Sequence, residues 1–74
     1  MTDKEKLNEI IERQGISISE LSRRSGTSRK RIYAILGGAD ANAQEIIGIS
    51  GALLLSDAER DLIFLTKNVT DSDK

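Results

Sequence analysis

The chain has 74 residues and a net charge of −1, and it contains no cysteine, histidine, tryptophan or proline. This length predicts one domain, and the absence of cysteine and histidine excludes a disulfide framework and the usual zinc-stapled domain. Because no apolar run approaches the roughly 18 residues of a membrane span and the first residues are charged rather than signal-like, we expect a soluble cytoplasmic protein with no metal and no cofactor.

The first predicted element is a helix over residues 3–14, followed by a cap at Gly15. Thr2 and Glu5 have the spacing of a capping box, in which a hydroxyl accepts from the third amide of the helix and the carboxylate reaches back. Glycine after a helix enters the left-handed region without a steric penalty. The inward stripe of this helix is expected to be Leu7, Ile10 and Ile11.

Two short helices follow, over residues 18–24 and 29–36. Ser17 and Glu20 repeat the capping-box spacing before the first of them, and Ser28 is the expected N-cap of the second. The two glycines that follow position 36 end the second helix. The residues expected to face inward are Ile18, Leu21, Ile32, Ile35 and Leu36.

The last third of the chain predicts helices over residues 43–54 and 57–67. No alternating pattern is long enough to compete as a strand, so the fold class is predicted to be all-α with five helices. We expect the domain to comprise residues 1–67 and residues 68–74 to form a flexible polar tail. The signals are the capping spacings Asn42 with Glu45 and Ser56 with Glu59, and the stripe Ile46, Ile49 or Ser50, and Leu53.

One segment of the last helix is apolar on all sides. A terminal helix needs only one apolar face, so we expect this segment to divide between the core and an interface with another chain. The residues expected to take part in this dimer or partner interface are Leu62, Ile63, Phe64 and Leu65.

The cationic side chains gather in the middle quarter of the chain. Residues 21–39 carry five cations and no acid, whereas residues 1–20 and 40–74 have net charges of −2 and −4. This asymmetry predicts one basic face for an anion on an otherwise acidic protein. The five cations are Arg23, Arg24, Arg29, Lys30 and Arg31.

Residues 18–36 carry the pattern of a helix-turn-helix. Ser22 is the small residue that a steep helix crossing needs, and Gly26 is able to take the positive φ of the turn. The pattern resembles the Cro-type family of helix-turn-helix repressors, with the lambda-repressor-like fold, over roughly residues 5–62. Leu54 and Leu55 depart from it, because they stand where that family usually has Gly-Val. The run that carries the resemblance is Leu21, Ser22, Gly26, Ser28, Ile32 and Ile35.

The resemblance implies roles in DNA binding by position. The second helix of the motif enters the major groove, where an arginine fork suits guanine. Helix starts and basic residues around it bind phosphates. The residues implied to touch base edges are Arg29, Lys30, Tyr33 and Ala34. Those implied to touch phosphates are Ser17, Ser28, Arg31, Gly37, Gly38, Arg23 and Arg24.

Simpler explanations exist for each of these residues. Gly26 fits a plain helix C-cap, the basic run fits a solvated helix face, and Tyr33 fits a half-buried packing position. Arg23 and Arg24 also suit the negative end of a helix dipole. What favours DNA binding is the register of Gly26 with the apolar residues of the motif, together with the absence of acid around it.

We therefore expect a transcriptional regulator, a repressor of phage or bacterial type, and not an enzyme. It would bind an operator in double-stranded DNA as a homodimer on two half-sites about 34 Å apart. A different class remains open, namely a protein-binding modulator (an antirepressor) that pairs with another repressor protein. An antitoxin would combine both activities.

Overall fold

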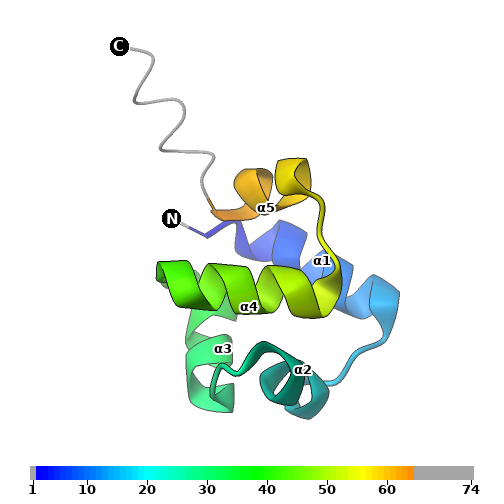
Figure 1. The fold of residues 1–74 in the computed structure, drawn as a ribbon, viewed down its shortest axis with the longest axis vertical. Coiled ribbons are helices and arrows are strands. Elements are labelled where there is room, and N and C mark those ends of the chain that lie inside the picture. The colour runs from blue at the N-terminus through cyan, green and yellow to red at the C-terminus, as the bar shows by residue number, and fades with distance from the viewer. Residues whose placement is uncertain (1, 65–74) are drawn as a thin grey trace.

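The computed structural model describes residues 2–64, which form five α-helices and no strand (Figure 1). The prediction of an all-α fold is confirmed, and the expected bounds of the first four helices are met to within one residue. Leu65, the expected end of the last helix at residue 67 and the expected tail 68–74 lie outside the described residues. The helices are α1 (Lys4–Gln14), α2 (Ile18–Ser25), α3 (Arg29–Leu36), α4 (Ala43–Leu53) and α5 (Asp57–Phe64).

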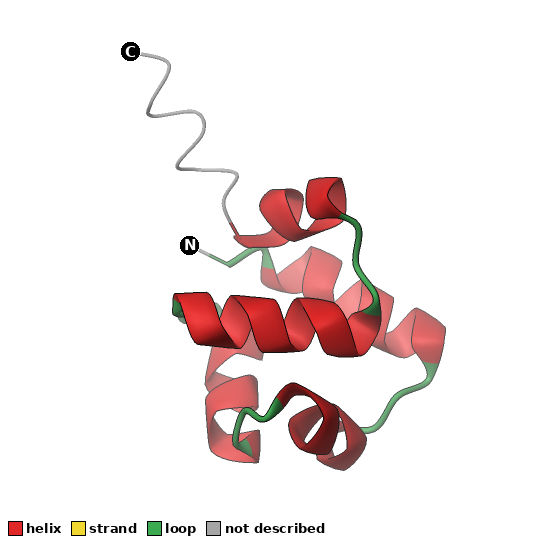
Figure 2. Cartoon of the chain, viewed as in Figure 1, coloured by secondary structure: helices red, strands yellow, loops and turns green. Residues whose placement is uncertain are grey.

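Short loops connect the helices, and α4 crosses the middle of the molecule with α5 above it and α2 and α3 below it (Figure 2). Polar caps fix where most of these helices begin. The Ser17 hydroxyl accepts from the Glu20 amide at 3.1 Å, and Ser28 caps α3 in the same way. Reciprocal capping boxes form between Asn42 and Glu45 before α4, and between Ser56 and Glu59 before α5.

The start of α1 corrects the sequence prediction. Its N-cap is Asp3, whose carboxylate accepts from the Lys6 amide, and not Thr2. The Thr2 side chain is buried instead, and its hydroxyl donates to the carbonyl of Ala39 at 2.9 Å. The Asp3 amide donates to the carbonyl of Ile63 at 2.7 Å. The beginning of the chain therefore ties α1 to α5 and to the loop before α4.

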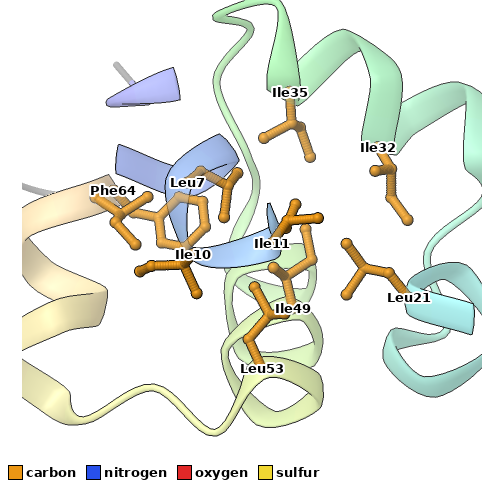
Figure 3. Packing of buried hydrophobic residues seen from close by; sticks show 10 residues of the cluster. Leu7, Ile10, Ile11, Leu21, Ile32, Ile35, Ile49, Leu53 and Phe64 are labelled. Carbon is orange, nitrogen blue, oxygen red and sulfur yellow. The ribbon is translucent and has the colours of Figure 1, made fainter. Parts of the chain in front are cut away.

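The core gathers apolar side chains from all five helices. Figure 3 shows Phe64 lying beside Leu7 and Ile10, while Leu21 and Ile32 point into the same interior. Packing of this kind is the main source of stability in so small a domain. The core residues are Leu7, Ile10, Ile11, Leu21, Ile32, Ile35, Ile49, Leu53, Ile63 and Phe64.

This core corrects part of the predicted interface on the last helix. Ile63 and Phe64 are 0% and 4% exposed within a single chain, so neither is available to a partner. They are buried because α5 packs over α1, and the hydrogen bond from the Asp3 amide to the Ile63 carbonyl holds α5 to the start of α1. Of the described residues in the apolar segment, Leu62 alone remains exposed.

Helix α4 passes very close to the end of α2. A Cβ atom on Gly48 would lie 2.3 Å from the carbonyl oxygen of Ser25. Backbone cannot retreat as a flexible side chain can, so this contact requires glycine. The sequence analysis did not single out Gly48, although a glycine inside a helical pattern commonly marks a packing constraint.

Two glycines of α4 give a matched test of this contact. We expect Gly48→Ala to lower the free energy of unfolding by about 2 kcal/mol, because overpacking against Ser25 outweighs the better helix propensity of alanine. Gly51→Ala is the control, since a Cβ there meets nothing within 4 Å, and it should raise stability by about 0.5–1 kcal/mol. Urea unfolding of dilute protein measures both, and equal effects of the two changes would contradict the packing argument.

Candidate nucleic-acid interface

The connection between α2 and α3 is a tight turn held by its own side chains. Gly26 ends α2 with φ of 74°, as the helix-turn-helix pattern predicts. The Ser22 hydroxyl donates to the carbonyl of Thr27 at 2.7 Å, and the Thr27 amide donates to the Ser25 hydroxyl at 3.2 Å. Ser22 is therefore more than a small residue at a crossing, because it also satisfies a polar group of the turn. These bonds fix the position of α3 relative to α2.

The outer face of α3 presents the residues that the resemblance assigns to base edges. Arg29, Lys30, Tyr33 and Ala34 are all exposed, on the side opposite the buried Ile32 and Ile35. Tyr33 is 61% exposed, so packing does not account for it in the described part of the chain. The structure thus brings the four predicted residues together on one helix face, free of neighbouring segments.

Arg29 and Lys30 differ from the other cations of the region. Among residues 2–64, neither forms an ion pair with an acid. The guanidinium of Arg29 reaches across to the start of α2, where Nη1 donates to the Ser19 hydroxyl at 3.4 Å. Ser19, which the sequence analysis did not name, lies two residues after the predicted phosphate contact Ser17. Arg29 therefore bridges α3 and the start of α2.

Arg31 is turned away from this face and forms an ion pair with α4. Its Nε and Nη2 atoms donate to the two carboxylate oxygens of Glu45 at 2.7 and 3.0 Å, and Nη2 also donates to the carbonyl of Asp40. The Glu45 side chain is only 11% exposed. A bidentate pair of this geometry is stronger than an ordinary surface pair. Arg31, predicted to touch a phosphate, is therefore engaged by Glu45 in this structure.

The carboxylate of Glu45 has three donors. Besides Arg31, it accepts from the amide of Asn42 and so completes the capping box of α4. The hydrogen bonds from Arg31, followed by the one from the Asn42 amide, lower the pKa of Glu45 to about 2. One side chain therefore fixes both the start of α4 and its attachment to α3.

Arg23 and Arg24, predicted to touch phosphates, both pair with Glu20 on the same face of α2. Arg24 Nε lies 2.6 Å from Glu20 Oε2, and Arg23 binds the other carboxylate oxygen. Hydrogen bonds from Arg23 and then Arg24 lower the pKa of Glu20. The acids that pair with the basic run lie just outside it in sequence, at positions 20 and 45. Two of the five positive charges are thereby balanced. Of the three that remain, one is shared by Arg23 and Arg24 around Glu20, and the other two, Arg29 and Lys30, have no acidic partner among residues 2–64.

The other predicted phosphate contacts fall into two groups. Ser17 and Ser28 are exposed at the starts of α2 and α3, where the first amides of each helix lack an intrahelical acceptor. The amides of Gly37 and Gly38 instead donate to carbonyls of α3 and close that helix. Gly38 has φ of 111°, a backbone conformation that by itself explains a glycine at this position, without any contact to DNA. The serines are thus placed for an anion, whereas both glycine amides are already in use.

Within residues 2–64 no three acidic, histidine or cysteine side chains gather as a metal site would require. In the same range no helix is both long and apolar enough to cross a bilayer. Comparison of the chain with protein-family models, curated proteins and solved structures finds no match.

The low pKa of Glu45 predicts how stability depends on pH. Its folded pKa of about 2 is below the ordinary 4.5, so its contribution is complete above pH 4.5 and is lost as the pH falls toward 2. At pH 7 we expect Glu45→Gln to lower the free energy of unfolding by about 1–3 kcal/mol, since it removes hydrogen bonds to a charged group. Urea unfolding at several pH values should show this difference shrinking below pH 4.5. A difference that stays constant with pH would contradict the assignment.

Proposed function

We propose that the chain is a sequence-specific, double-stranded DNA-binding transcriptional regulator, and that it acts as a repressor in a prokaryotic cell or a phage-infected host. The observation that supports this most is the outer face of α3. It is fully open, and among the described residues it carries the only two cations of the basic run without an acidic partner, Arg29 and Lys30.

The dimensions and chemistry of this face suit the major groove. The groove is about 12 Å wide and admits one α-helix. Arg29 would present its fork to O6 and N7 of a guanine, and Lys30 would approach a base edge or a neighbouring phosphate as a point charge. Tyr33 and Ala34, one turn further along, would contact bases or thymine methyl groups.

The start of α2 would hold the DNA backbone beside the reading helix. The first amides of α2, at Ile18 and Ser19, have no intrahelical acceptor, and the helix dipole there favours an anion. The Ser17 hydroxyl accepts from the Glu20 amide, which leaves its own proton for a phosphate oxygen. Because Arg29 already reaches Ser19, base reading and backbone contact would be linked through one side chain.

Arg31 would support this function by holding α3 in position rather than by contacting DNA. Its pair with Glu45 holds α3 against α4 before DNA arrives, so less ordering is needed on binding. We therefore propose a positioning role for Arg31 in place of the phosphate contact predicted from the sequence. Repression would be steric, and two copies on half-sites about 34 Å apart would read an operator with two-fold symmetry.

The direct test is a selection of duplexes from a random-sequence pool, followed by fluorescence-anisotropy titration at low and moderate salt. We expect binding to a selected duplex to exceed that to a shuffled one by about 10³ or more. Failure to enrich any sequence, with weak binding that salt erases, would contradict the proposal and favour a protein-binding modulator or antitoxin. Association with another repressor protein would then be the next measurement.

Two substitutions separate the roles of the cations. Arg29→Ala should cost about 1–3 kcal/mol on the selected duplex and relax preference at one base pair, since it removes a bidentate base contact. Lys30→Ala, if it neutralises a phosphate, should weaken binding to all sequences and reduce the salt slope by about 0.9. Both side chains are exposed, so melting temperatures close to that of the parent serve as the control. Identical losses on selected and shuffled DNA for both variants would refute these roles.

A further inference from the structure

A stripe on α4 combines three features that the single chain does not explain. Ile47 is 69% exposed and Leu54, directly after the helix, is 87% exposed. Gly51 lies between them, and a Cβ there would meet nothing within 4 Å. Ile47 and Gly51 are four residues apart and share one face of α4, and Leu54 lines the same shallow hollow as both. We call this set the α4 stripe.

Each member of the α4 stripe is unfavourable in an isolated chain. Exposed Ile47 and Leu54 gain nothing from burial, and Gly51 weakens the helix relative to alanine. Leu54 also has φ of 58°, a left-handed conformation that glycine or asparagine normally takes. Strain of this kind in an exposed apolar residue points to a role outside the folding of the chain itself.

A second helix lying against the stripe would turn all three features into favourable ones. The two large side chains would be buried, and Gly51 would let the backbones approach closely. The stripe borders a shallow hollow that is lined by Arg24, Ile47, Gly48, Gly51, Ala52 and Leu54. Large, small and large residues in this order form a surface that is complementary to itself when two copies run antiparallel, as an isologous interface requires.

Charge at the two ends of the stripe favours the same partner. Arg24 lies at one end, because its neighbour Ser25 contacts Gly48, and its side chain is 56% exposed. Asp57 follows Leu54 at the other end, with a side chain that is 92% exposed. An antiparallel two-fold arrangement brings the Arg24 end of one copy to the Asp57 end of the other. Both residues already form ion pairs within the chain, Arg24 with Glu20 and Asp57 with Arg60. Glu20 is shared with Arg23, and Arg60 is shared with Asp61, so one cluster keeps an excess positive charge and the other an excess negative charge. These opposite excess charges would face each other at both rims of the interface.

We propose that the α4 stripe is the surface through which two copies of this chain associate, with Gly51 near the two-fold axis. We expect the dimer to be weak, because the stripe has three residues whereas a standard interface has about 20–30 on each side. This proposal does not rest on DNA binding. It also differs from the interface first expected on α5, where Ile63 and Phe64 are in the core.

Sedimentation equilibrium of the full chain without DNA, from micromolar to millimolar concentration, tests the proposal. The parent is expected to form a reversible dimer. Leu54→Gly should raise the dissociation constant tenfold or more and yet raise the melting temperature of dilute protein by a few degrees, since it relieves the left-handed leucine. These opposite effects separate an interface role from a structural one. Ile47→Glu should abolish association, and Leu62→Glu on α5 is the matched control that leaves it unchanged.

The orientation has its own test in a charge exchange. Arg24→Glu and Asp57→Lys should each weaken the dimer, and the double variant should recover most of the loss. A parent that stays monomeric at millimolar concentration would overturn the proposal, and so would a Leu62→Glu variant that weakens association as much as Ile47→Glu. A parent protein that forms the dimer but binds no duplex sequence-specifically would instead count against the proposed function alone.

Discussion

The bidentate pair between Arg31 and Glu45 fixes the arrangement on which the proposed function depends. Glu45 accepts from Arg31 and from the Asn42 amide at once, so the start of α4 and its attachment to α3 share one carboxylate. From that start, α4 runs on to place Gly48 against the end of α2. The relative positions of α2, α3 and α4 therefore form a closed chain of contacts. The outer face of α3 is held in place by three sets of contacts. Ile32 and Ile35 pack in the core, Arg31 binds Glu45, and the Ser22 hydroxyl bonds the turn that precedes the helix.

The charges show how an acidic chain can offer a basic surface. The net charge is −1, and folding brings Glu20 and Glu45 into contact with three of the five cations in the basic run. What remains is a narrow positive face at Arg29 and Lys30 rather than a broad one. Nonspecific attraction to DNA scales with the number of phosphates neutralised, so a narrow face favours discrimination between sequences over general affinity.

Local signals predicted the helices well, because the helix starts carry their own capping residues and glycines end α1, α2 and α3. At the start of α1, Asp3 rather than Thr2 is the cap, because two adjacent polar residues both suit the position and a distant carbonyl accepts the Thr2 hydroxyl. At the start of α2, Ser17 caps the helix as predicted, but the Glu20 carboxylate binds Arg23 and Arg24 instead of completing the capping box. Contacts between helices could not be predicted from spacing. The Arg31 and Glu45 pair, the burial of Phe64 and the approach of Gly48 to Ser25 all join separate helices. The exposed α3 face with Arg29 and Lys30 was predicted from the sequence, whereas the ion pairs of Arg23, Arg24 and Arg31 were not.

An NMR titration tests the central claim most directly, by following the backbone amides of the full chain as a selected duplex is added. We expect shifts concentrated at the start of α2 and along the outer face of α3, from Arg29 to Ala34. The side-chain Nε–H of Arg31 should stay bonded to Glu45 throughout. Shifts confined to the α4 stripe, or a broken Arg31 pair in the DNA-bound state, would contradict the proposed reading face and its support by α4.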